Sequence, residues 1–441
     1  MRRSMEWNQL VSNTRVPSFG TSKETLENVF SSDYRRVVKS DSFRRLQDKT
    51  QVFPLERNDF VRTRLTHSLE VAMHARDLLS AVIKGLGRKG IKISELDESF
   101  RLLETAALIH DIGNPPFGHF GEEAIRIWFI QNGSALPCWS VLTPQQQADF
   151  IHFEGNAQTI RLLTKIHDDN GASRHGMKLA ASTMDAVIKY TANSIELDKT
   201  NLLTKKVGYF YSETKEYKLI KEATGSIGKR HPLVYILEAA DDLAYTFSDI
   251  EDAYNYGFYS YNELVAFVKK TAEIDHLIKE TETEAAEIQH FLREAQKKVY
   301  QSASAIFVEN YAEIMQGNFD KELIIENCEE VKLFEALKAF AIDNIFSAKE
   351  ILDQEVLGFN IMSRLLDELV PVVLKYEKEE MNQYEKRLFN NIPESAEKLF
   401  SKETRFCSED KKDYYRLKMA VDFVCNMTDG YAKKLHDRLF S

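Results

Sequence analysis

Histidine and aspartate side chains stand at three separated places in the sequence, each beside a run of apolar residues. His67 lies in RLTHS, His110 and Asp111 are adjacent in ALIHDIG, and Asp241 begins the acidic pair in EAADDLA. Imidazole and carboxylate groups together suit Mn²⁺, Fe²⁺, Co²⁺, Mg²⁺ or Zn²⁺. A His-Asp dipeptide by itself is usually incidental, so a metal site is predicted only where the fold brings the three places together.

Three predicted helices carry these residues. Residues 59–86 are apolar around more than half of a helical circumference, which predicts a buried helix with His67 at the margin of its apolar arc. Residues 97–112 predict a second helix, which the following Gly-Asn-Pro-Pro run terminates. A third helical pattern begins at residue 232. His110 is therefore expected where a buried helix ends.

The third helix distinguishes between two adjacent carboxylates. Its Leu, Ala and Phe side chains share one face, with Asp241 on the flank of that face and Asp242 pointing nearly opposite. A half-buried carboxylate without a partner is costly, so a metal or an ion pair is expected beside Asp241. On the first helix, Arg64 precedes His67 by the spacing that lets side chains meet. Its guanidinium suits bidentate contact with phosphoryl oxygens.

The composition predicts a packed, mainly α-helical protein. The chain has 441 residues, of which 43% are hydrophobic, and only 18 are Gly and 9 are Pro. The segment 207–220 alternates around a Ser-Glu-Thr-Lys turn and predicts a small β-hairpin. We expect residues 1–255 to form a helical bundle with the N-terminal segment, and residues 256–441 to form a helical C-terminal subdomain.

Charge, cysteines and hydropathy narrow the class of protein. The formal net charge of −10 does not favour nucleic acid as the main partner. Basic residues between positions 35 and 64 form either a solvated face or a local anion-binding wall, and both interpretations stay open. The four cysteines lack CxxC spacing, which favours reduced thiols. No segment approaches the roughly 18 apolar residues of a membrane span, so a cytoplasmic protein is expected.

Long motifs resemble the bacterial deoxyguanosinetriphosphate triphosphohydrolases of the HD superfamily. They are RLTHS, then ALIHDIGNPPFGHFGEEAI, then EAADDLAYTFSDIEDA, and the resemblance continues to DFVCNMTDGYA near the C-terminal end. The resemblance implies an HD-domain helical bundle and one divalent metal ion, with Mn²⁺ or Mg²⁺ expected first and Co²⁺, Fe²⁺ or Zn²⁺ as alternatives. The implied metal ligands are His67, His110, Asp111 and Asp241.

The resemblance also implies a reaction and the roles of further residues. Family members hydrolyse dGTP to deoxyguanosine and inorganic triphosphate, through attack at the α-phosphate. His119, oriented by Glu122, would be the catalytic histidine, since a carboxylate three residues away fixes the tautomer and raises basicity. Tyr245 would lie against the deoxyribose and Asp249 would bind the 3′-hydroxyl. The other expected substrate contacts are Arg64, Gln51, His152, Lys189 and Tyr190.

Two departures from the family pattern leave questions open. Asn114 stands where many HD phosphohydrolases have a second histidine, and Gly430 stands where the family's ending often has arginine. One alternative is a broader dNTP triphosphohydrolase activated by a second nucleotide. Another is a nucleotide-sensing or single-stranded-DNA-binding HD protein, which has no need of a positioned pair such as His119 and Glu122. The resemblance further implies a homo-oligomer, a hexamer, with interfaces in the C-terminal subdomain, and weak single-stranded DNA binding.

Overall fold

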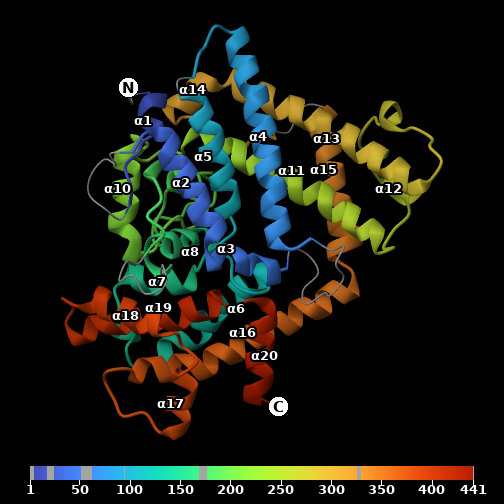
Figure 1. Ribbon diagram of the computed structural model, residues 1–441. Coiled ribbons are helices and arrows are strands. Elements are labelled where there is room, and N and C mark those ends of the chain that lie inside the picture. Colours follow the sequence, from blue (N-terminus) through green and yellow to red (C-terminus); the bar gives the residue numbers. More distant parts are fainter. Residues whose placement is uncertain are drawn as a thin grey trace.

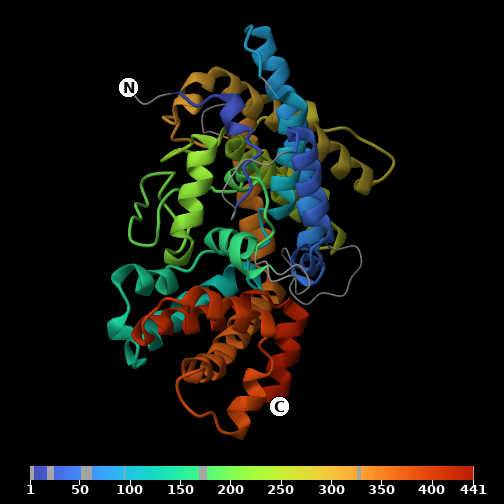
Figure 2. The ribbon, with the colours of Figure 1, turned by 60° about the vertical axis from the view of Figure 1, so that its left-hand side comes forward.

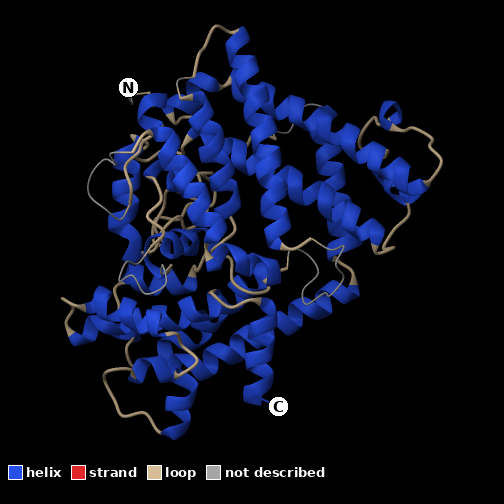
Figure 3. Ribbon diagram, in the orientation of Figure 1, coloured by secondary structure: helices blue, strands red, loops and turns tan. Residues whose placement is uncertain are grey.

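Helices make up the regular structure of the described chain (Figure 3). The computed structural model describes residues 4–16, 24–50, 62–93, 95–167, 176–324 and 329–440. Within these ranges the only β-type pairings are isolated bridges, so the predicted mainly α fold is confirmed. No helix in the same ranges is both long enough and apolar enough to cross a membrane.

The α-helices follow one another as α1 (Trp7–Leu10), α2 (Leu26–Lys39), α3 (Asp41–Arg45), α4 (Arg64–Arg88), α5 (Leu96–Ile109), α6 (Gly118–Asn132), α7 (Pro144–Ile151), α8 (Gly155–Arg161), α9 (Ala181–Asp185), α10 (Thr214–Thr224), α11 (Pro232–Asn255), α12 (Tyr261–Val268), α13 (Glu284–Glu309), α14 (Tyr311–Gln316), α15 (Glu329–Ala341), α16 (Lys349–Lys375), α17 (Gln383–Phe389), α18 (Glu394–Thr404), α19 (Glu409–Cys425) and α20 (Asp429–Phe440). Short 3₁₀ turns include Leu46–Asp48 and Tyr211–Glu213, and π-helical turns cover Leu162–Ile166 and Ile342–Phe346.

Helix α4 is the central element of the bundle. It packs against α5, α11 and α13 (Figure 1). Its start is fixed by a capping box, in which the Thr63 hydroxyl accepts from the Thr66 amide while the Thr66 hydroxyl accepts from the Thr63 amide. Buried side chains such as Val71 and Leu78 recur on its inner face. The first turn of α4, with Arg64 and His67, is therefore held at a fixed place in the core.

Two hydrophobic clusters form the interior. The first joins the N-terminal helices to α11, α13 and α15. The second joins α6 and α7 to the C-terminal helices α16, α19 and α20, which Figures 1 and 2 show in orange to red as a layer beneath the rest. Because this second cluster contains residues from both predicted parts of the chain, the division into residues 1–255 and 256–441 stays a prediction.

The predicted β-hairpin over residues 207–220 is wrong. The structure has a 3₁₀ turn at Tyr211–Glu213, followed by helix α10 (Thr214–Thr224). The helix forms because Tyr217 and Ile220 are buried at a spacing of three residues, which is a helical period.

Candidate active site

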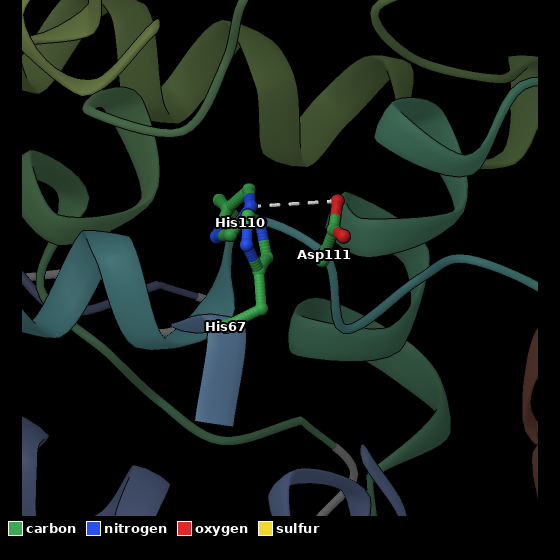
Figure 4. Close-up of side chains that lie close together, drawn as sticks. All are labelled: His67, His110 and Asp111. Carbon is green, nitrogen blue, oxygen red and sulfur yellow. Dashed lines mark ion pairs between the residues drawn. The ribbon is translucent and has the colours of Figure 1, made fainter. Parts of the chain in front are cut away.

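The three places singled out in the sequence meet at the end of α5. His67 comes from α4, and His110 and Asp111 follow the last residue of α5; their ligand atoms lie within 4.8 Å of one another (Figure 4). Asp241 of α11 joins them, because its Oδ1 lies 3.1 Å from His67 Nε2 and 3.3 Å from His110 Nε2. All four residues predicted as metal ligands are thus neighbours.

The imidazole of His110 is oriented for binding a cation. Its Nδ1 donates a hydrogen bond of 2.7 Å to the backbone carbonyl of Ala107. That bond places the proton on Nδ1 and leaves the lone pair on Nε2, the arrangement typical of a metal-bound histidine. His110 Nε2 is buried and has no hydrogen-bond partner in the described chain. An unpartnered buried nitrogen beside two carboxylates fits a divalent metal ion.

Both carboxylates of the cluster, Asp111 and Asp241, are held ionised. Burial alone would raise the pKa of Asp111, but the neighbouring His110 and Arg64 outweigh burial and lower it. The same competition lowers the pKa of Asp241, where Lys189 and His110 outweigh burial. Arg64 Nη1 contacts Asp111 Oδ2, and Lys189 Nζ lies 3.1 Å from Asp241 Oδ2. The two carboxylates are therefore charged at neutral pH, as metal ligands must be.

The two adjacent aspartates of α11 differ as the helical periodicity predicted. Asp241 faces the histidines, whereas Asp242 Oδ2 lies 3.9 Å from Lys338 Nζ on another side of the helix. Burial raises the pKa of Asp242 to about 7, with Lys338 opposing that rise. Asp242 thus has neither the position nor the stable charge of a ligand.

A cavity of about 500 Å³ opens onto this cluster. Its lining also includes the residues predicted to bind phosphate and sugar, together with His119 and Glu122. A cavity of about 550 Å³ between α18, α19 and the segment before α20 contains none of the predicted site residues, so the chemistry points to the smaller one. The predicted residues that line the smaller cavity are Arg64, Asp111, His119, Glu122, Lys189, Tyr190, Asp241, Tyr245 and Asp249.

His119 and Glu122 form a hydrogen-bonded pair in the first turn of α6. His119 Nδ1 lies 3.1 Å from Glu122 Oε2, and the His119 side chain is 82% exposed while that of Glu122 is buried. The hydrogen bond to Glu122 raises the pKa of His119. The other oxygen of Glu122 accepts a 2.7 Å hydrogen bond from the Gly155 amide. The carboxylate is thus anchored, and the imidazole presents Nε2 to its surroundings.

A glycine makes room for Arg64 beside the metal cluster. Gly118 has φ +57°, and a Cβ at this position would lie 2.6 Å from Arg64 Nη2. Any other residue would be strained and would displace the guanidinium. Gly118 directly precedes His119, so one short stretch of chain carries the predicted catalytic histidine and leaves the backbone space needed for an arginine.

Two predicted substrate contacts differ from the rest. His152 follows the last residue of α7, its side chain is exposed, and it is not among the residues that line the cavity. The end of α7 turns its side chain toward solvent, so the substrate contact expected of His152 stays a prediction. Gln51 lies outside the described residues.

The sequence interpretation missed several residues that line the cavity. Glu154 is buried and accepts a 2.8 Å hydrogen bond from Asn156 Nδ2, and its Oε1 lies 3.4 Å from Lys206 Nζ. The signal available in the sequence was a carboxylate and an amide in HFEGN and a lysine in KKVGYF, polar side chains that stand beside apolar residues. Phe346 and Glu355, also in the lining, come from a distant helical stretch without any local signal.

The fold and the site together define an HD-domain protein: a helical bundle with a His, His-Asp and Asp cluster on its central helices. The HD domain family matches residues 64–168. A deoxyguanosinetriphosphate triphosphohydrolase-like protein of Listeria innocua is 36% identical, covering 99% of each chain. A deoxyguanosinetriphosphate triphosphohydrolase of Yersinia enterocolitica is 31% identical, covering 96% of each. The chain belongs to the deoxyguanosinetriphosphate triphosphohydrolase family.

The contrast between Asp241 and Asp242 gives a direct test of the metal site. Asp241→Asn removes a charged oxygen from the cluster, so the affinity for Mn²⁺ should fall by at least about tenfold. Asp242→Asn, the matched control on the next residue, should keep the affinity of the unaltered protein. Isothermal titration calorimetry with Mn²⁺ measures both. Equal losses in the two variants would contradict the assignment of Asp241.

The hydrogen bond between His119 and Glu122 can be tested by measuring the pKa of His119. Glu122→Gln removes the charge that raises the pKa of His119, so this pKa should fall toward its ordinary value. Nuclear magnetic resonance of the His119 imidazole across pH measures the change. Glu123→Gln, at an exposed neighbouring position, is the control and should leave the pKa where it was. An unchanged pKa in Glu122→Gln would show that the hydrogen bond does not form in solution.

Proposed function

We propose that this protein is a divalent-metal-dependent triphosphohydrolase that converts dGTP to deoxyguanosine and inorganic triphosphate. The observation that carries the proposal is that one cavity is lined by two carboxylates of the proposed metal site, three cationic side chains and a hydrogen-bonded histidine-carboxylate pair. The names of the relatives in Listeria innocua and Yersinia enterocolitica support the choice of substrate. A protein that only sensed a nucleotide would have no use for an anchored proton-transfer pair.

The metal would be held by His67, His110, Asp111 and Asp241. A divalent cation at these ligands supplies Lewis-acid chemistry, which polarises phosphoryl oxygens and lowers the pKa of water. Mn²⁺ or Mg²⁺ is the proposed ion, because the two carboxylates among the four donors suit both.

The triphosphate would be bound by the cations of the cavity. Arg64 and Lys189 already contact the ligand carboxylates, so their charges lie beside the place where an α-phosphate would reach the metal. Arg64 Nε is buried without a hydrogen-bond partner in the described chain, which leaves a donor for a phosphoryl oxygen. Lys206, whose side chain is 40% exposed at the same cavity, would bind the outer phosphates.

His119 would transfer the proton that the reaction needs. Attack of water on the α-phosphorus breaks the bond to the 5′-oxygen of the nucleoside, which leaves as an alcohol only if it gains a proton. With Nδ1 engaged by Glu122, protonated His119 can donate from Nε2 to that oxygen. The raised pKa of His119 keeps this proton available near neutral pH.

The sugar would lie along α11. Tyr245 and Asp249 follow Asp241 by four and eight residues, and both line the cavity. Tyr245 packed under C2′ would exclude a 2′-hydroxyl, which gives a physical reason for preferring dNTP over NTP. Burial raises the pKa of Asp249 well above its ordinary value, so a protonated carboxyl could donate to the 3′-hydroxyl oxygen. The hexamer, weak DNA binding and the cytoplasmic location stay predictions.

The proposed activity is tested by turnover of each dNTP separately and in mixtures, with Mn²⁺, with Mg²⁺ and with chelator. We expect hydrolysis of dGTP in preference to the other dNTPs, and loss of turnover with chelator. Phosphorus nuclear magnetic resonance should identify inorganic triphosphate. Release of pyrophosphate or orthophosphate would contradict attack at the α-phosphate, and turnover of dATP only after dGTP is added would favour the nucleotide-activated alternative.

The role of His119 is tested by a pair of histidine variants. His119→Ala should lower kcat for dGTP by about 10²- to 10⁴-fold, because proton transfer is lost while the ligands for metal and phosphate stay. Binding of dGTP, measured calorimetrically with Ca²⁺ in place of the active metal, should stay within about threefold of the unaltered protein. His276→Ala, at an exposed histidine outside the cavity, is the control and should retain full turnover. Full turnover by His119→Ala would remove it from the mechanism.

A further inference from the structure

We propose that Asp429, in the first turn of α20, is a positioning residue that holds the loop carrying His119. Asp429 does not line the cavity, and it lies far from His119 in the sequence. Its side chain nevertheless contacts Phe117, the N-cap residue of α6. The inference rests on the proposed function only in taking His119 as the proton donor.

Phe117 is the strained point of this loop. It has φ +61°, in the left-handed region, and serves as the N-cap of α6. A phenylalanine adopts this conformation only where its surroundings enforce it. The Phe117 amide donates a 3.0 Å hydrogen bond to Asp429 Oδ1, and both partners are buried. Asp429 therefore accepts the hydrogen bond from the backbone amide of the strained residue.

The ring of Phe117 is held by a second C-terminal helix. Gly358 of α16 lies so close that a Cβ on it would be 2.6 Å from Phe117 Cγ. A larger residue at position 358 would push the ring away. The backbone of Phe117 is thus fixed by α20 and its ring by α16, and neither helix belongs to the part of the chain that carries the metal ligands.

The other oxygen of Asp429 binds Thr50, in the segment that precedes α4. Asp429 Oδ2 accepts hydrogen bonds from the Thr50 amide at 2.9 Å and from the Thr50 hydroxyl at 2.5 Å. The adjacent Lys49 donates from Nζ to the carbonyls of Asn114 at 2.5 Å and Cys425 at 2.9 Å. The Lys49 carbonyl accepts from the Arg64 amide at 3.0 Å. One buried carboxylate and one buried lysine thus join the catalytic loop, the start of α4 and the turn between α19 and α20.

The position of His119 follows from these contacts. His119 is two residues after Phe117, so a change in the backbone angles of Phe117 swings the first turn of α6. Glu122 would stay behind, because the Gly155 amide holds its other oxygen. Loss of the Asp429 contact should therefore separate His119 from its productive position while the metal ligands keep theirs.

The test compares Asp429→Asn with Asp437→Asn in the full-length protein. The carboxylate accepts hydrogen bonds from Thr50 on one oxygen and from Phe117 on the other. An amide has only one oxygen, so one of these two contacts is lost. We expect kcat for dGTP to fall by about 100-fold, with KM changed by less than about threefold. Asp437 lies on the same helix, is half exposed and pairs with Lys433, so its variant should behave like the unaltered protein.

A double-variant cycle distinguishes an effect of Asp429 on the position of His119 from an unrelated loss of structure. If Asp429 acts through His119, then adding Asp429→Asn to His119→Ala should lower kcat little further. A structural role unrelated to His119 would lower kcat by the same factor in both backgrounds, and that result would overturn the proposal.

A second readout does not depend on turnover. Loss of the contact should weaken the hydrogen bond from His119 to Glu122, so the pKa of His119 measured by nuclear magnetic resonance should fall in Asp429→Asn. Absence of dNTP turnover in the unaltered protein would refute the proposed function but leave this shift to decide the positioning. If Asp429→Asn does not fold, the same two measurements are made on Thr50→Val, which removes the hydroxyl that donates to Asp429. Values of kcat and of the His119 pKa equal to those of the unaltered protein would overturn the inference.

Discussion

The balance of charge around Asp111 and Asp241 is the constraint on which the rest of the structure depends. Two carboxylates in a buried position are tolerated because Arg64 and Lys189 stand beside them. Arg64 in the first turn of α4 contacts Asp111 just after the end of α5, and α11 packs against both helices. The same ion pairs would lie beside the proposed metal ion and the proposed nucleotide.

Periodicity explains which parts could be predicted from the sequence. The choice of Asp241 over Asp242 needed only the 3.6-residue repeat, since the apolar face of a long helix fixes which side is inward. The hairpin failed because short alternation and helical spacing overlap in one segment, and burial of Ile220 favoured the helix. The exposure of His152 could not be predicted, because the direction of a side chain at a helix end depends on the turn that follows. Glu154 and Phe346 reach the cavity through tertiary packing, for which a sequence has no local pattern.

The two departures from the family pattern have a structural context. Asn114 lines the cavity and packs against Gly155, where a Cβ would lie 2.3 Å from Asn114 Oδ1. The asparagine thus fills space between the catalytic loop and α8, a role that needs no proton transfer. Gly430 lies beside Asp48, whose Oδ2 would be 2.9 Å from a Cβ at this position. A longer residue at position 430 would have to displace that carboxylate, and Gly430 is not among the residues lining the cavity.

The hydrogen bond between Phe117 and Asp429 joins residues 312 positions apart in the chain. Contacts of such long sequence separation form late, because the entropy of closing a large loop opposes them. A chain still emerging from the ribosome holds every metal ligand well before α20 exists. The loop that carries His119, however, lacks its contact with Asp429 until the last helix is synthesised and docked. If Asp429 positions His119 as proposed, a product truncated before α20 would keep the proposed metal ligands but lose most of the hydrolytic activity.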